Sequence, residues 1–380
     1  MRTVEPPNRR TATVRAVTLA ALLMCAAVVS FEAAGKAVPA VAIGGTGLLY
    51  VGGYAGKISI LDEATEKLVG EIPMKTGIPL DMVLSRDRKR FYAITTFLED
   101  IDVVDIPSRQ VVDTFRLTEG NRRVRINAFE VDPAGQFMVM SVRAATRLTD
   151  RWDIGPSELL LYDLKAHKVS KKIPWPNGEE RDRANLLFSP DGKYLYFFAD
   201  DVFIYDTATY EVVDKWELSR PVEDGFGRLE LGGVDILNEE PGYFTGLFTS
   251  EDPVQHRQVT GIARVNLSEK RVDFYAVGPA QDQIRTFTLA PGRKLAYAIL
   301  SRIGHYEFWT FDLTGRRLQS RTEFAGRPRL AVKTSTNGKL LYLYQAGNTI
   351  DLWDASTYKY LRTVTLAADM TTDLFVIPAK

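Results

Sequence analysis

The sequence contains almost no cysteine or histidine. Cys25 is the only cysteine among 380 residues, and there are three histidines. A chain with one thiol cannot form an internal disulfide, a multi-thiolate metal site or the Cys-x-x-Cys-His attachment of a c-type haem. His167, His256 and His305 are widely separated, with no other ligand at metal-binding spacing. We therefore expect this chain to bind no metal or cofactor by itself.

An excess of one charge and the common catalytic motifs are also missing. Lys and Arg number 48, as do Asp and Glu, and no basic stripe stands out, which argues against nucleic acid as a partner. The sequence has no Gly-x-Ser-x-Gly elbow, no phosphate-binding glycine loop and no His-Glu-x-x-His. The glycine-rich segment 52–56 is expected to be a turn between strands, and no helix follows it. A catalytic function thus has no motif to support it.

The first 37 residues differ from the rest of the chain. A basic segment with four arginines up to Arg15 precedes an uncharged apolar run over residues 16–30, and small residues gather at 33–37. This three-part pattern predicts a secretory signal peptide over residues 1–37, cleaved between 30 and 37. The apolar run is shorter than the roughly 20 residues that span a bilayer. We expect a periplasmic or secreted protein without membrane insertion after cleavage, with an uncleaved anchor as the alternative.

One pattern repeats from Leu48 onward. It consists of an apolar strand, a turn resembling Ser-Pro-Asp-Gly-Lys, an aromatic-rich strand, a third strand ending in Asp and a short fourth strand. Residues 189–207 are the clearest copy. Asp, Asn, Pro and Gly suit these turns because tight hairpins need self-capping side chains and positive φ angles. Weaker copies of the turn lie at 85–89, 132–135, 290–294 and 336–339.

The end of the third strand marks the repeat most clearly. Seven positions carry this mark: Asp62, Asp105, Asp163, Asp206, Asn266, Asp312 and Asp354. Their mean spacing of about 49 residues is the period of four-stranded propeller blades. No stretch of 10 to 15 residues between the marks has helical periodicity. The sequence predicts an all-β, seven-bladed β-propeller with four-stranded blades, formed by residues 38–380 as a single domain.

The two chain ends are predicted to share one blade. The first copy lacks its opening strand, because residues 47–51 already match the second strand. The C-terminus has one strand in excess, Asp373–Ile377. This strand would complete the first blade as its innermost member, and pairing the two ends removes the edges that an open array would expose.

The longer repeats predict a binding face. Extra residues lie between the second and third strands of blade three (143–156) and blade five (249–258), and between blades at 174–183 and 219–232. All four connections belong to one face, which we call the expanded face. Loop elaboration on a rigid scaffold favours binding, and neutral variation is the alternative. The candidate docking residues are Arg147, Trp152, Asp252 and His256.

The innermost strands are expected to begin with polar residues at the mouth of the central channel. These residues are Asp81, Asn127, Asn185, Asp235, Arg285 and Arg329. They could bind a ligand, or they could be the polar lining that any wet channel needs. A carboxylate pair such as Asp81 with Asp235 would also permit acid–base chemistry, although most such carboxylates are solvated surface.

Two resemblances add to this interpretation. Leu49-Tyr50-Val51-Gly52-Gly53, together with 57–62 and 189–193, resembles the YVTN class of exported bacterial propellers. The order of normal and expanded blades is similar to that of the β subunit of quinohemoprotein amine dehydrogenase. In blade three, the long excursion 147–152 leads into the strand 158–163, and a compact blade four follows. In blade five, 248–253 leads into 260–267, and the chain ends in the closing strand.

The second resemblance implies a role as one subunit of a periplasmic complex that oxidises primary amines. Haem and quinone would then lie on partner subunits, and this chain would bind other protein subunits. No short motif marks functional residues in that subunit, so no residue role carries over. The alternatives are a stand-alone secreted propeller that binds a small molecule, glycan or envelope protein, and an independent enzyme with a carboxylate pair at the channel mouth.

Overall fold

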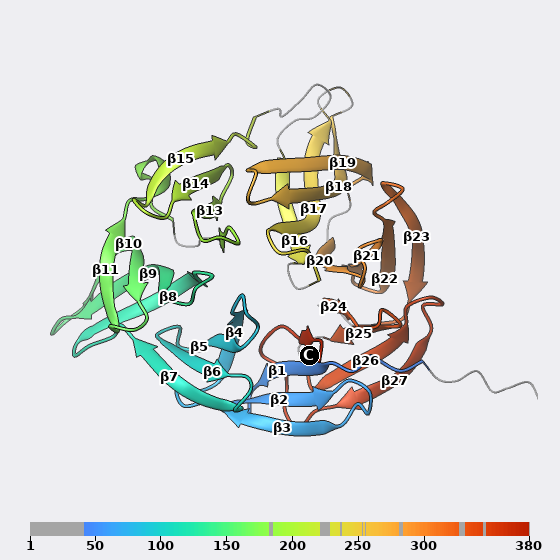
Figure 1. Ribbon diagram of the computed structural model, residues 1–380, viewed down its shortest axis with the longest axis horizontal. Helices are drawn as coiled ribbons and strands as arrows, with labels where there is room; N and C mark the ends of the chain where they lie inside the picture. Colours follow the sequence, from blue (N-terminus) through green and yellow to red (C-terminus); the bar gives the residue numbers. More distant parts are fainter. Residues whose placement is uncertain are drawn as a thin grey trace, which may run out of the picture. The chain divides into compact units, whose positions relative to one another are not determined.

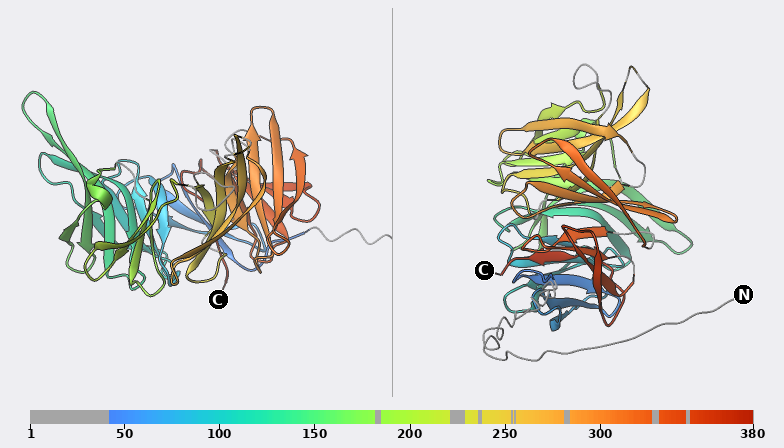
Figure 2. Two further views of the ribbon diagram at one scale, coloured as in Figure 1. Left: turned by 90° about the horizontal axis from the view of Figure 1, so that it is seen from above. Right: turned by 90° about the vertical axis from the view of Figure 1, so that its right-hand side faces the viewer.

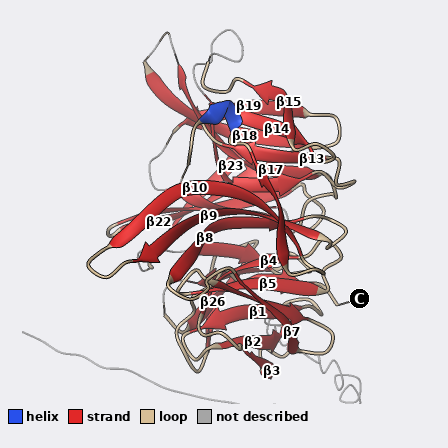
Figure 3. Cartoon of the chain, turned by 90° about the vertical axis from the view of Figure 1, so that its left-hand side faces the viewer, coloured by secondary structure: helices blue, strands red, loops and turns tan. Residues whose placement is uncertain are grey.

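The computed structural model describes residues 42–181, 185–220, 229–235, 238–252, 254, 256–280, 284–326, 331–344 and 347–379. The predicted signal peptide and Arg329 lie outside these residues. Within them, no helix is long and apolar enough to cross a membrane. The short 3-10 helix η1 (Pro176–Gly178) is the one helix that they contain, and all other regular structure is strand (Figure 3).

The described residues form seven antiparallel sheets of four strands, arranged around a common centre (Figure 1). This confirms the predicted seven-bladed propeller. From the centre outward, blades one to three are β28 (Phe375–Ile377), β1 (Leu48–Gly53), β2 (Lys57–Asp62) and β3 (Leu68–Pro73); β4 (Pro79–Leu84), β5 (Arg90–Thr95), β6 (Asp100–Asp105) and β7 (Gln110–Arg116); and β8 (Arg122–Val131), β9 (Phe137–Arg147), β10 (Trp152–Asp163) and β11 (Lys168–Ile173).

The other four blades follow in chain order. They are β12 (Asn185–Phe188), β13 (Tyr194–Phe198), β14 (Val202–Asp206) and β15 (Glu211–Trp216); β16 (Leu229–Asp235), β17 (Tyr243–Asp252), β18 (Arg257–Asn266) and β19 (Arg271–Pro279); β20 (Ile284–Leu289), β21 (Leu295–Arg302), β22 (His305–Asp312) and β23 (Arg317–Phe324); and β24 (Ala331–Thr334), β25 (Leu340–Tyr344), β26 (Thr349–Asp354) and β27 (Tyr360–Thr365).

Blade one is completed by the C-terminus, as predicted. β28 pairs antiparallel with β1, with Leu48 opposite Ile377 and Tyr50 opposite Phe375. Phe91 of blade two lies 5.4 Å from the ring of Tyr50 and 5.1 Å from that of Phe375, between ring centroids. The closing strand therefore pairs within its own blade and packs against the next blade.

Apolar packing between blades explains the strand sequences. Each of the seven interfaces between neighbouring blades contains its own cluster of buried apolar side chains. Inner strands such as β5 and β25 are buried on both sides and are apolar almost throughout, whereas an outer strand such as β11 is largely exposed and polar. A strand that packs against neighbours on both faces loses the alternation of apolar and polar residues.

The seven marks predicted at the ends of the third strands are confirmed, and the turn chemistry explains them. Asp62 Oδ1 accepts from the backbone N–H of Thr65 at 2.7 Å, and Asp206 Oδ1 accepts from that of Ala208 at 2.8 Å. The other five blades have the same bond from the equivalent Asp or Asn. Such a side chain satisfies backbone donors that the turn leaves free.

These turns also share an unusual backbone conformation. The fourth residue after each mark has a φ between 52° and 58° although none of the seven is glycine. These residues are Glu66, Arg109, His167, Tyr210, Lys270, Arg316 and Tyr358. A side chain in the left-handed region carries a steric cost, and here the capped turn holds it in place in every blade.

The extra residues of blades three and five form strands where loops were expected. β9 continues to Arg147 and β10 begins at Trp152, so 143–156 is mostly paired, and Arg147 lies opposite Trp152. In blade five, Asp252 lies opposite Arg257. The β9–β10 hairpin projects beyond the adjacent blades (Figure 2, left). The loop prediction was wrong here because the backbone ladder simply extends along both strands, which satisfies the added N–H and C=O groups.

Candidate functional site

Exposed apolar side chains occur on the expanded face in several blades. In each of blades one, two, three, five and six, the connection between the second and third strands carries at least one exposed apolar side chain. The most exposed is Ile303 in blade six, at 98%. The residues are Tyr54, Phe97, Leu148, Trp152, Ile154, Val254 and Ile303. On the opposite face, the described turns between first and second strands and between third and fourth strands carry no exposed large apolar residue. The exposed Ile43, which precedes β1 and accepts from Asn337 of the turn 335–339, is an exception on the opposite face. The described turns of the two faces therefore differ in chemistry as well as in length.

The β9–β10 hairpin presents an apolar side at its outer end. Trp152 is 47% exposed and Ile154 66% exposed, and residues two apart in a strand point to the same side. Backbone bonds hold the end of the hairpin, with the N–H of Leu148 donating to the C=O of Arg151 at 2.8 Å. Arg147 is fixed at the same end, because its N–H donates to the C=O of Asn121. The candidate residues Arg147 and Trp152 thus lie on an ordered projection.

The candidate residues of blade five lie at the end of the second hairpin. Asp252 Oδ1 accepts from the N–H of Val254 at 2.9 Å and Asp252 Oδ2 lies 3.7 Å from Arg257 Nε. His256 is exposed and adopts a φ of 51°. Exposed Val254 sits between them in the chain, so this end combines one apolar side chain with charged neighbours.

The polar residues predicted at the channel mouth do not all lie at the same height along their strands. Asp81 and Asn185 each face the fifth residue of the second strand in their blade. Asp235 faces the third residue, because β16 starts at Leu229 and ends at Asp235. The expectation that Asp235 begins its strand was therefore wrong, since β16 carries a bulge and runs further than the repeat indicated. The expectation that Asn127 begins its strand was also wrong, because β8 begins at Arg122 and Asn127 lies at a bulge inside it. Arg285 likewise lies at a bulge, next to the first residue of β20.

The channel brings together charged residues that the sequence interpretation missed. Asp373, just before β28, lies 3.7 Å from Lys333 of β24 and accepts from the Tyr344 hydroxyl at 3.0 Å. Asp81 is exposed on the innermost strand β4, yet desolvation by the surrounding strands raises its pKa, and the charge of Asp373 adds to this. Glu130 of β8 is half-buried, and desolvation raises its pKa to about 8, opposed by Arg86. The sequence did carry a sign of this buried charge, because Glu130 lies between the apolar residues Phe129 and Val131 at the end of a strand.

Replacing Glu130 by Gln should change how stability depends on pH. The pKa of Glu130 lies at about 8 in the folded protein against a usual 4.5. The stabilisation that the folded state gains from protonated Glu130 is therefore fully present below pH 4.5 and is lost as pH rises through 8. Glu130→Gln should match the wild type near pH 4.5 and be about 1–3 kcal/mol more stable at pH 8.5. Urea unfolding across this range measures the difference. A wild-type-minus-variant difference that stays flat with pH would contradict it.

The histidines lie in three blades and pair with carboxylates where they have partners. His167 Nε2 lies 3.0 Å from Asp113, and His305 Nε2 lies 2.7 Å from Glu307. Over the described ranges, no group of three His, Cys, Asp or Glu side chains is placed to hold a metal ion.

Comparison with known proteins shows the fold alone. No protein-family model matches the sequence, and no curated protein matches it. A functionally unknown protein from Desulfotomaculum acetoxidans is 12% identical, with 88% of this chain and 99% of that chain covered and a TM-score of 0.55. The β-propeller domain of Cps50 (Swd1) from Myceliophteria thermophila is 12% identical, with 78% and 90% covered and a TM-score of 0.52. Hydrazine synthase from Kuenenia stuttgartiensis is 14% identical, with 83% and 90% covered and a TM-score of 0.48.

Proposed function

We propose that this chain is an exported, non-catalytic propeller subunit that binds a partner protein through its expanded face. The carrying observation is that five connections of that face each carry at least one exposed apolar side chain. The role would be similar to that of the β subunit of a quinohemoprotein amine dehydrogenase. Haem and quinone would then belong to partner subunits, and this chain would position them without taking part in the chemistry.

The β9–β10 hairpin has the features of an interface anchor. Trp is the residue most often found at energetic centres of interfaces, surrounded by polar side chains at the rim. Trp152 and Ile154 supply the apolar centre, while Arg147, Asp150 and Arg151 supply charge beside it, with Arg151 Nη1 3.2 Å from Asp150 Oδ1. Because a strand ladder holds this end, little conformational entropy is lost on binding.

The proposal predicts that Trp152→Ala/Ile154→Ala separates the protein from its partner while leaving the propeller folded. Truncating two central apolar side chains should weaken the complex by about 100-fold or more. The matched control is Val212→Ala/Val213→Ala, which removes exposed apolar side chains from the outer strand β15. The measurement is gel filtration of the native complex from its source, monitored by haem absorbance and by amine-dependent dye reduction.

Two results would count against this function. The untagged wild-type protein could elute as a monomer without haem or dye reduction. Alternatively, the β15 control could lose the partner as completely as the hairpin variant, which would move the interface away from the expanded face.

A further inference from the structure

One turn between a first and a second strand differs from all its equivalents. In blades two, three, four, six and seven this turn has five residues, whereas in blade five it has seven, between Asp235 and Tyr243. It also lacks the Ser-Pro-Asp-Gly-Lys pattern and carries Glu239 and Glu240 instead. An irregular copy within a regular repeat marks a place where something other than the fold determines the sequence.

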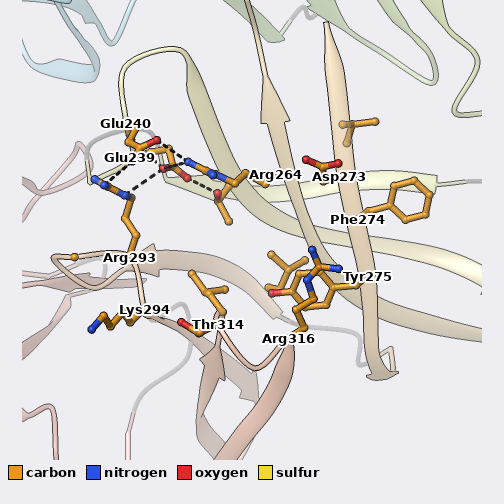
Figure 4. A pocket seen from close by; sticks show the side chains of 15 residues that line it. Glu239, Glu240, Arg264, Asp273, Phe274, Tyr275, Arg293, Lys294, Thr314 and Arg316 are labelled. Carbon is orange, nitrogen blue, oxygen red and sulfur yellow. Dashed lines mark hydrogen bonds and ion pairs between the residues drawn. The ribbon is translucent and has the colours of Figure 1, made fainter. Parts of the chain in front are cut away.

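This turn borders a cavity of about 650 Å³ between blades five and six. The cavity lies on the face opposite the expanded face, because its walls include the turns at 292–294 and 313–316. Its volume falls within the range of small-ligand sites. Figure 4 shows the glutamates above, Arg293 and Lys294 on one side, and Arg316 beside Tyr275 on the other.

The carboxylates that line this cavity are already paired with arginines. Glu239 is buried, and its Oε1 accepts from Arg264 Nη2 at 3.2 Å. Glu240 accepts from Arg264 at 3.0 Å and from Arg293 at 2.7 Å. Asp273 accepts from Arg271 at 3.1 Å, outside the lining. The negative charge at the cavity is therefore neutralised from within the protein.

Two cations of the lining are not neutralised in this way. Across the described parts of the chain, neither Lys294 nor Arg316 forms an ion pair with a carboxylate. The guanidinium of Arg316 lies 5.5 Å from the ring centroid of Tyr275. Burial raises the pKa of Tyr275 to about 12, so its hydroxyl stays protonated as a donor. Apolar Val272, Phe274 and Leu313, each partly exposed, also line the cavity.

We propose that this cavity binds a small organic anion. Its carboxylate would contact Lys294 and Arg316, and its apolar body would pack against Phe274, Leu313 and the ring of Tyr275. Charge-assisted bonds from a lysine and an arginine give both strength and direction to carboxylate binding. The paired glutamates fix Arg264 and Arg293, so the cavity keeps its shape and presents the two remaining cations to the ligand.

Isothermal titration with 4-phenylbutyrate tests the proposal, with 4-phenylbutanol as the uncharged probe of the same shape. The acid should bind with a Kd of about 1 mM or tighter, and the alcohol at least about tenfold more weakly. Lys294→Gln/Arg316→Gln should weaken binding of the acid by a further tenfold or so. Circular dichroism and the Tm verify that this variant is folded.

The control variant is Lys339→Gln/Lys359→Gln, which removes two charges from blade seven. Lys339 precedes β25 as Lys294 precedes β21, so it tests the same turn position in a blade without this cavity. The control should bind the acid like the wild type. No binding of the acid up to about 10 mM, equal binding of acid and alcohol, or equal losses in both double variants would overturn the proposal. None of these results bears on the expanded face.

Discussion

Replacing Val376 by Asp should lower the free energy of unfolding by about 4 kcal/mol. Val376 is 4% exposed on the closing strand β28 and packs in the cluster between blades seven and one, with Leu49 and Leu374. A carboxylate at this position would be buried without a partner, and it would also weaken the pairing of β28 with β1. Urea unfolding followed by fluorescence measures the loss.

Ala379→Asp is the matched control for this substitution. Ala379 follows the closing strand and is exposed, so an added charge there should change stability by less than about 0.5 kcal/mol. If the Val376 variant unfolded at the wild-type urea concentration, the closing strand would contribute nothing to stability, and the shared blade would have no energetic role.

Replacing Glu63 by Gln should lower the free energy of unfolding by about 3 kcal/mol. Glu63 is 1% exposed, and its carboxylate accepts from the N–H of Gly47 at 2.8 Å, the N–H of Thr336 at 2.7 Å and the hydroxyl of Tyr342 at 3.0 Å. Burial, together with the charge of Glu63, raises the pKa of Tyr342 far above its usual value. A Gln side chain would place an NH2 group where one carboxylate oxygen now accepts, and the backbone N–H of Thr336 or of Gly47 would then lose its acceptor.

Glu211→Gln serves as the control for the loss of charge alone, because Glu211 is exposed on the outer strand β15. It should leave the unfolding midpoint unchanged within error. A Glu63 variant as stable as this control would show that the buried carboxylate does not hold blade seven against blade one.

Local turn chemistry is what made the ring predictable. Each Asp or Asn mark caps its own turn within three residues, so the signal that places a strand end lies beside it in the chain. The closing strand was predictable for a related reason, since one strand was missing at one end and one was in excess at the other.

Contacts between distant residues were not predictable. Glu63 and Tyr342 are 279 positions apart, and nothing near Glu63 announces that its carboxylate will be buried. The pairing of Asp373 with Lys333 likewise joins two blades and leaves no local sign in the sequence. Asp235 was expected at the start of its strand but lies at its end. A bulge in β16 shifts the register, and a bulge leaves little trace in a single sequence.

The shared blade also sets an order in time. Residues near 48 are synthesised more than 300 residues before residue 376, which pairs with them on the inner side of the blade. At ribosomal rates this leaves blade one incomplete for on the order of tens of seconds. Throughout that interval the backbone groups of β1 that later pair with β28 are without that partner, and an unpaired edge invites association with other chains. Any factor that shields this edge of β1 from other chains would therefore act before β28 has paired with it.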